Sequence, residues 1–340
     1  MEKQISISEI EYGGKRKRTQ KEKFLEKMEN IIPFDKWCEI IRPYYYKNGN
    51  GRQPIELTVM LKMYLVSLWY NLSDEAAEDL IYESLSVRHF VGIRSDAPDA
   101  TTLCKFRHIL EQHQLTGVIF NELTKLLQEK GILFKEGTIV DATIISAPDS
   151  NKNKDKKPNP EMKATKKGGK TYFGAKAHIG VDKKSGMVHS VAVTTANKSD
   201  VEHANEVLHG EEREIYGDAG YTGLEKRAEV CEKYQDGTGR KEKQKPSHGK
   251  KRADTLVKRE EVKFVINRKR QSVTSQEEKA EEKAKSQVRA KVEHAFCVLK
   301  HIYGYRKTRY RTIEKTAHQV LMLFALVNLY RCMQQGLSTK

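Results

Sequence analysis

The spacing of hydrophobic positions in the first part of the chain has the period of α-helices. Between Lys21 and Lys130, apolar residues recur every three or four positions, as on the buried face of an amphipathic helix. The segment from Phe24 to Ile32 shows this spacing, and the more apolar segment from Ile55 to Trp69 predicts a largely buried helix. Ser73 is followed by two acids, a pattern that favours the start of another helix. This part of the chain is therefore predicted to be all-α.

A different pattern begins at Thr138, where β-branched residues predict strands. The sequence TIVDATIIS predicts one strand, and YFGAKAHIGVD and MVHSVAVTT, joined by a short turn, predict a hairpin. Two further strands are expected in REIYG and EVKFVINRK, with a short helix over Val201–Leu208 before the first of them. Helical spacing returns near the end of the chain and predicts helices over Gln276–Ile302 and Thr312–Met333.

These patterns predict an α/β protein whose mixed sheet is preceded by an all-α domain. We expect a basic flexible leader over residues 1–20, a helical domain over 21–135 and an α/β domain over 136–335. Two lysine-rich segments inside the second domain, 149–170 and 236–258, are expected to be solvated basic loops.

The charge of the chain indicates an acidic partner. The formal net charge is +16 over 340 residues, which favours nucleic acid over a membrane surface. No apolar stretch is long enough to span a bilayer, so we expect no membrane partner and a cytoplasmic location. The five cysteines are scattered and form no CxxC pair, which argues against a zinc knuckle and a disulfide framework.

Two aspartates lie within or just after predicted strands, at positions where they could form a chemical site. Asp141 lies inside the apolar strand IVDATII, where a charge is costly unless it is paired or bound to metal. Asp218 follows the strand-like REIYG and precedes AGYTG, whose glycines allow a sharp turn beside an ion or phosphate. Carboxylates that converge from separate elements are what two-metal phosphoryl transfer requires.

A third acid is expected on the long helix that begins near Gln276. Glu293 is surrounded by apolar residues, which marks the half of this helix that packs inward. On a helical wheel, Arg289, Glu293 and Lys300 lie within roughly 40° of one another. One helix face thus presents an acid between two cations. Glu293 could instead be a surface residue paired only with Arg289, and the pattern leaves both interpretations open.

The three acid-bearing motifs resemble those of the DDE transposases. Asp141 in IVDATIISAP, Asp218 in YGDAGYTG and Glu293 in RAKVEHAFCVLK correspond to the three acids of that group. The segment YFGAKAHIGVDKKSGMVHSVAVTTANKSD and the N-terminal GRQPIELTVMLKMYLVSLWYNLSD and PDATTLCKFRHILE further resemble the insertion-sequence-five family. The resemblance covers roughly residues 30–335.

This resemblance implies a bacterial or archaeal, nucleoid-associated enzyme with an RNase H-like catalytic domain. It implies hydrolysis of a phosphodiester at the ends of a mobile element, followed by attack of the freed 3′-OH on target DNA. Asp141, Asp218 and Glu293 would be the catalytic residues and the ligands of Mg²⁺, for which Mn²⁺ would substitute. Double-stranded DNA, as terminal inverted repeats and as target, is the implied partner of a homodimer.

The predicted DNA contacts come from two parts of the chain. Arg289 and Lys300 match part of a Tyr, Arg, Glu, Lys signature in the related group and would hold phosphates, whereas Ser286 stands where tyrosine is usual. Lys291 is a further candidate on the same helix. In the all-α domain, residues 86–110 are either a DNA-reading helix pair that presents Lys105 and Arg107 or a structural pair.

Other acids and two alternative functions compete with this interpretation. Asp149, Asp182 and Asp200 stand in loop or turn contexts and are expected to cap or solvate rather than bind metal. A nuclease of the same fold would keep all three acids and would differ only in failing to join 3′-OH ends. A DNA-binding protein derived from a transposase would show a broken set of acids, which this sequence does not have.

Overall fold

The computed structural model describes residues 17–46, 54–93, 96–148, 159–234 and 262–339. These residues form two compact units, one within Met1–Ile119 and Leu329–Lys340 and the other within Phe120–Asn328. The division lies inside a helix, earlier than the predicted boundary near residue 135, and the C-terminal residues belong to the first unit. In the part of the chain that was searched, no helix is both long and apolar enough to cross a membrane.

The first unit is helical, as predicted. Helix α4 is buried on almost all sides because it is apolar around its whole circumference, and the other helices pack around it. Ser73 accepts a hydrogen bond from the backbone of Ala76, which confirms the predicted helix start, and Thr19 and Asp99 cap two other helices in the same way. The helices are α2 (Gln20–Ile31), α3 (Phe34–Tyr45), α4 (Leu57–Trp69), α5 (Asp74–Glu83), α6 (Leu85–Val91) and α7 (Ala100–Gln112), followed by α8 (Leu115–Glu129), which continues into the second unit.

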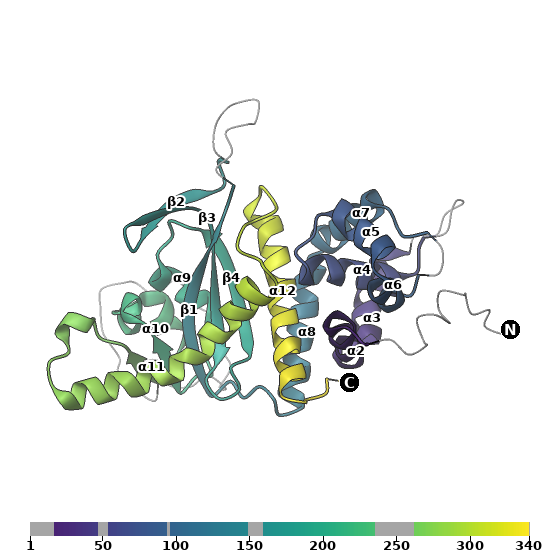
Figure 1. Cartoon of the computed structure of the whole chain (residues 1–340). Coiled ribbons are helices and arrows are strands. Elements are labelled where there is room, and N and C mark those ends of the chain that lie inside the picture. The colour runs from purple at the N-terminus through teal and green to yellow at the C-terminus, as the bar shows by residue number, and fades with distance from the viewer. Residues whose placement is uncertain (1–16, 47–53, 94–95, 149–158, 235–261, 340) are drawn as a thin grey trace. The chain divides into compact units, whose positions relative to one another are not determined.

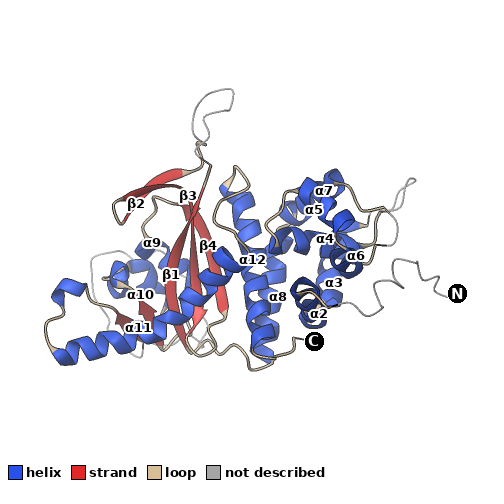
Figure 2. Ribbon diagram, in the orientation of Figure 1, coloured by secondary structure: helices blue, strands red, loops and turns tan. Residues whose placement is uncertain are grey.

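The second unit contains a six-stranded mixed sheet (Figure 2). Strand β1 pairs antiparallel with β3 and parallel with β5, and β5 pairs parallel with β6. Strand β3 is the longest, and β2 and β4 pair antiparallel with successive parts of it. The strands are β1 (Gly137–Ser146), β2 (Lys163–Lys167), β3 (Lys170–Asp182), β4 (Val188–Thr195), β5 (Glu214–Gly217) and β6 (Lys263–Ile266).

Helices cover both faces of this sheet. Helix α9 (Asp200–Val207) packs on β1, β3 and β4, and its Ala204 and Val207 share an apolar cluster with Val140 of β1. Because side chains alternate along a strand, Asp141 points to the opposite face, where α11 (Gln276–Cys297) crosses β1 and β5 (Figure 1). The predicted α/β architecture is confirmed.

The chain continues beyond α11 in a way that the helical wheel did not predict. A π-helical segment, Val298–Ile302, replaces the last turn of the predicted helix, and α12 (Ile313–Gln334) closes the unit and enters the first one. The amide of Tyr303 donates to the carbonyl of Val298 at 2.9 Å, so this turn holds one more residue than an α-turn. Lys300 is therefore rotated away from the α-helical position that the wheel assumed.

The prediction of a basic loop over residues 149–170 is partly wrong. Within 149–170, Lys163–Lys167 form strand β2, which pairs with the start of β3 through a two-residue turn. Gly168 and Gly169 occupy that turn with φ of 57° and 76°, a left-handed conformation that glycine adopts without a steric cost. Residues 149–158 and the second predicted loop, 236–258, lie outside the described residues.

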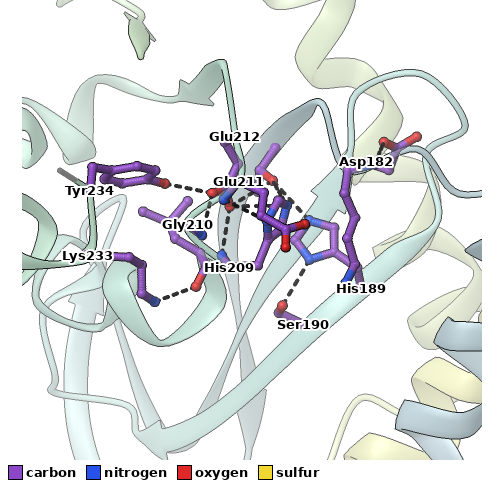
Figure 3. Close-up of polar contacts among 12 residues, drawn as sticks. Asp182, His189, Ser190, His209, Gly210, Glu211, Glu212, Lys233 and Tyr234 are labelled. Atoms are coloured by element: carbon purple, nitrogen blue, oxygen red, sulfur yellow. Dashed lines mark hydrogen bonds and ion pairs between the residues drawn. The ribbon is translucent and has the colours of Figure 1, made fainter. Parts of the chain in front are cut away.

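A buried polar cluster joins the start of β1 to the turn before β5 (Figure 3). The fully buried Glu212 accepts hydrogen bonds from Thr138, from the backbone of His209 and Gly210, and from the hydroxyl of Tyr234 at 2.7 Å. His189 of β4 meets the same Thr138 hydroxyl at 3.0 Å. Hydrogen-bonding partners on every side offset the cost of burying this carboxylate.

Candidate active site

The sheet brings Asp141 and Asp218 to the same level on adjacent strands. Strands β1 and β5 run parallel, with Ile139 opposite Tyr216. Continuing this register by two residues places Asp141 beside Asp218, which follows the last residue of β5. The Asp218 carboxylate is close enough to raise the pKa of Asp141. Two acids from separate elements therefore meet in space as predicted.

Asp141 is an acid held in a poorly hydrated position. Its side chain is 19% exposed, and Oδ1 accepts a hydrogen bond from the amide of Ala142 at 2.7 Å. Burial raises the pKa of Asp141 to about 6, although the Ala142 amide and the Arg289 guanidinium act in the opposite direction. Near neutral pH this carboxylate is mostly ionised but incompletely compensated, a state that favours binding of a cation.

Asp218 is fixed by the turn that follows β5. Its side chain accepts a hydrogen bond from the amide of Gly220 at 2.8 Å and thereby caps the short 3₁₀ turn Ala219–Tyr221. A Cβ at Gly220 would lie 2.9 Å from Oδ1 of Asp218, so only glycine leaves this carboxylate in place. Gly220 of the YGDAGYTG motif is thus needed for the position of the Asp218 carboxylate.

Arg289 connects the acid pair to the far edge of the sheet. Its Nη2 lies 3.7 Å from Oδ2 of Asp141, and its Nη1 donates to Oδ1 of Asn267 at 3.1 Å. Asn267 directly follows β6 and is itself held by Glu282 of α11 at 2.7 Å. The Nε of Arg289 is buried and has no hydrogen-bond partner among the described residues.

Glu293 is not joined to the two aspartates. It is exposed and makes no hydrogen bond or ion pair within the described part of the chain. Among the described residues, no group of three acids, histidines or cysteines is close enough to hold a metal ion. Glu293 nevertheless lies one helical turn beyond Arg289 on α11, a spacing of about 6 Å along one face.

The other predicted cations have different environments. The Lys300 ammonium donates to the carbonyl of Ile144 in β1 at 2.8 Å, and burial lowers its pKa. Lys291 donates to the carbonyls of Lys183 and Lys184 at 2.7 and 3.0 Å, so it supports the turn between β3 and β4. The structure thus gives both side chains protein partners and brings only Lys300 to the strand that carries Asp141.

The two predicted contacts on α7 also differ. Lys105 is exposed. Arg107 instead forms ion pairs with Asp74 of α5 at 2.5 Å and with Glu111 at 3.6 Å, and only 11% of its side chain is exposed. Arg107 therefore holds two helices of the first unit together, while Lys105 is available to a partner.

Two of the acids set aside in the sequence have structural partners. Asp182 accepts hydrogen bonds from the amides of Lys135 and Ser185 at 3.1 and 2.6 Å and from the Ser185 hydroxyl, as expected of a turn residue. Asp200 pairs with Lys176 of β3 at 2.8 Å. Asp149 lies outside the described residues.

Sequence reasoning missed two residues of this site, Asn267 and Tyr221. Asn267 is the first residue after EVKFVI, and a polar residue at the end of an apolar strand was the available signal. Tyr221 is almost fully buried, and the charges of Asp141, Asp200 and Asp218 add to burial in raising its pKa well above 10. Its hydroxyl is thus kept protonated beside the acids.

Two family models match this chain. The model described as "Transposase DDE domain" matches residues 132–329, and the one described as "Transposase domain (DUF772)" matches residues 15–109. No solved structure matches. A mixed sheet with helices on both faces and acids on its central strands defines the RNase H-like class of DNA-processing enzymes. The chain belongs to the DDE transposases and is an enzyme that acts on DNA in transposition.

The acid pair fits the divalent metal ion that DDE transposases generally use. Carboxylate oxygens are the ligands that hard cations such as Mg²⁺ prefer, and both aspartates offer them from rigid elements. The raised pKa of Asp141 shows that its negative charge has too little compensation from the protein alone.

Proposed function

We propose that this protein is a transposase of the insertion-sequence-five family that cleaves DNA at the ends of its element and joins the freed 3′-OH ends to target DNA. The observation that carries the proposal is the position of Asp141 and Asp218 at one level of two parallel strands, with Arg289 of α11 against Asp141. Asp141, Asp218 and Glu293 would hold the metal ions, Mg²⁺ in the cell with Mn²⁺ as a substitute. A bound divalent cation would activate the attacking oxygen and stabilise the leaving one.

The protein's own residues would position the phosphodiester. The backbone amides of Ala142 and Gly220 hold the carboxylates of Asp141 and Asp218, so the acids need little rearrangement to act together. The Arg289 guanidinium lies beside Asp141 and would hold a phosphate oxygen there. Glu293, one turn further along α11, is the acid nearest to this position on the same helix face and would complete the metal site.

Regions of the protein outside the acid pair would recognise the two DNA ends of the element and bring them together. The helical first unit would bind the terminal inverted repeats, with the exposed Lys105 as a contact, and Lys300, Lys291 and Arg107 remain candidates that must first release their protein partners. Cutting and joining at two ends requires two active sites, which favours a homodimer on paired ends. We place the reaction in the cytoplasm, at the nucleoid.

A cleavage and strand-transfer assay tests the proposal. The substrate is a duplex that carries the terminal repeat found beside the gene, and the variants are Asp141→Asn and Asp218→Asn. Both should lose cleavage in Mg²⁺ by at least about 100-fold while they bind the duplex nearly as well as the wild type, because binding depends on phosphate contacts. Cleavage by Asp141→Asn at the wild-type rate would exclude this site. Pre-cleaved 3′-OH ends, supplied with target DNA, separate a transposase from a nuclease of the same fold.

A further inference from the structure

Two basic segments flank the end of β1 that extends beyond the acids. One is the turn and facing strands of β2 and β3, Lys163–Tyr172, which we call the lysine hairpin, and it projects at one end of the sheet (Figure 1). The other is the extended segment Arg306–Arg311, which we call the arginine strip. Neither segment contains an acidic residue.

Backbone hydrogen bonds fix the arginine strip to β1. The amide of Ser146, the last residue of β1, donates to the carbonyl of Arg306 at 3.1 Å, and the amide of Thr308 donates back to Ser146 at 2.8 Å. Within the strip Thr308 is buried and Tyr310 is partly buried, whereas Arg306, Lys307, Arg309 and Arg311 are exposed. The strip therefore presents a row of cations on a rigid support.

The lysine hairpin presents three of its four lysines on one face, and Lys166 belongs to the other face. The register places Lys167 directly opposite Lys170, and Lys163 and Tyr172 lie on the same face because side chains alternate. Phe173 belongs to the other face, where it packs on the apolar cluster of Ala147 and Met162. The three lysines are exposed and form no ion pair in the described part of the chain.

The placement of these cations suggests what compensates them. Like charges directly opposite each other on a hairpin repel, and no acid of the hairpin relieves the pair Lys167 and Lys170. Lys167 also acts electrostatically on both Asp141 and Lys300, so the hairpin lies close to the acid site. A polyanion that reaches the acids would pass between these cations.

We infer that the lysine hairpin and the arginine strip form a track for the phosphate backbone of the DNA duplex whose end is held at Asp141 and Asp218. This inference rests on the proposed function. Ala147, which directly follows β1, lies six positions beyond Asp141, and this corresponds to about 20 Å of extended chain. A duplex is also about 20 Å across, and it presents phosphates at a spacing of about 3.4 Å along each strand. The track would therefore contact phosphates within the first helical turn from the cleaved end, without reading sequence.

The salt dependence of DNA binding by the full chain tests the track. The test variant is Lys167→Gln/Lys170→Gln, and the matched control is Lys279→Gln/Lys283→Gln, which removes two exposed lysines from the start of α11. The probe is a fluorescein-labelled duplex of about 30 base pairs with arbitrary sequence, titrated with EDTA present and with NaCl between about 50 and 200 mM. Two lost phosphate contacts reduce the slope of log K against log salt by about two.

A slope reduction in the hairpin variant that exceeds that of the control by one or more supports the track. A smaller difference overturns it, because loss of net charge alone would then explain the effect. Lys167→Arg/Lys170→Arg keeps both charges and should keep the wild-type slope, and a reduced slope in this variant would also overturn the track. Cleavage of the element's ends by the wild type tests the proposed function separately. If the wild type cleaves but the hairpin and control variants have equal salt slopes, only the track is overturned.

Discussion

The guanidinium of Arg289 lies between the carboxylate of Asp141, at 3.7 Å, and the side-chain oxygen of Asn267, at 3.1 Å. The three residues belong to α11, β1 and the end of β6, which are far apart in the sequence. The Arg289 and Asp141 side chains are only 17% and 19% exposed, so their attraction is screened less than that of a surface pair. This arrangement fixes the face of α11 that is turned toward the acids.

Two substitutions of Arg289 should separate the effect of its charge on cleavage from the effect of its planar geometry. Arg289→Lys keeps the charge but loses the planar fork that reaches both partners, so we expect cleavage to fall roughly 10-fold. Arg289→Ala also removes the phosphate contact and should reduce cleavage by about 100-fold or more. Single-turnover cleavage rates in saturating Mg²⁺ measure both effects. Equal rates for the lysine variant and the wild type would show that charge alone suffices.

Asp141→Asn should stabilise the metal-free protein while it abolishes cleavage. Burial raises the folded-state pKa of Asp141 to about 6, above its ordinary value of 3.8, so its charge disfavours folding. The stability cost is absent below pH about 4, grows as the pH rises toward 6 and is complete above it, where it amounts to at most about 3 kcal/mol. Thermal unfolding in EDTA at pH 4.5 and 7.5 measures the gain. A gain of equal size at both pH values would contradict this origin.

The acids were predictable because their local patterns are unusual. An aspartate inside an apolar strand, and another before a glycine turn, are visible in the sequence, and the structure brings Asp141 and Asp218 together as expected. The same holds for the order of strands and helices from β3 onward. Roles that depend on tertiary contacts were not visible. No pattern indicates that Arg289 reaches Asn267, since 22 residues separate them and the contact arises only when α11 crosses the sheet.

Two errors have a clear physical cause. The sequence predicts a solvated loop for the lysines of β2, because β2 is exposed along its length and lacks the alternation of a half-buried strand. Its pairing is instead determined by β3 and by the glycine turn. The helical wheel that aligned Lys300 with Glu293 assumed a regular α-helix, whereas a π-helical segment begins at Val298.

The buried histidines predict that stability falls in mild acid. Burial lowers the pKa of His189 far below 6.5, and burial also lowers that of His209. Both accept a proton less readily when folded than when unfolded, so their contribution is complete above pH about 6.5 and is lost as the pH falls below it. Each histidine can cost up to about 1.4 kcal/mol per pH unit.

The variant His189→Gln isolates one of these contributions. The free energy of unfolding, measured in urea between pH 5 and 7, should depend less steeply on pH in this variant than in the wild type. Wild-type steepness in the variant would mean that His189 is protonated in the folded state. The exposed His108→Gln is the matched control.

Lys105 and Arg107 lie on the same helix, but substituting Lys105 should change DNA affinity whereas substituting Arg107 should change stability. Lys105→Ala removes an exposed cation, so we expect weaker binding to terminal repeats, a salt slope reduced by about one and unchanged thermal stability. Arg107→Ala leaves Asp74 and Glu111 without their shared partner and should cost about 1–3 kcal/mol of stability. Affinity and melting temperature are measured for both variants. The helix pair would be purely structural if Lys105→Ala bound DNA like the wild type.

Glu293 and Lys300 belong to the same part of the chain but should have separable roles. Glu293→Gln keeps size and hydrogen bonding but removes the charge that would hold a cation, so turnover should be lost while DNA affinity stays near normal. Lys300→Ala should weaken binding to the cleaved end and lower the salt slope by about one, with the metal requirement unchanged. It also leaves the carbonyl of Ile144 without its donor, so the variant's folding is checked by its melting temperature.

A paired titration of DNA affinity against NaCl and of cleavage rate against Mg²⁺ distinguishes the two roles. Glu281→Gln is the matched control for the acid, because Glu281 is exposed on the same helix and pairs only with Lys285 at 2.9 Å among the described residues. This control should cleave normally. If Glu293→Gln instead lost DNA affinity and kept a normal Mg²⁺ response, Glu293 would act through an ion pair and not as a metal ligand. The exposed position of Glu293 makes this the most informative measurement, because Asp141 and Asp218 meet without it.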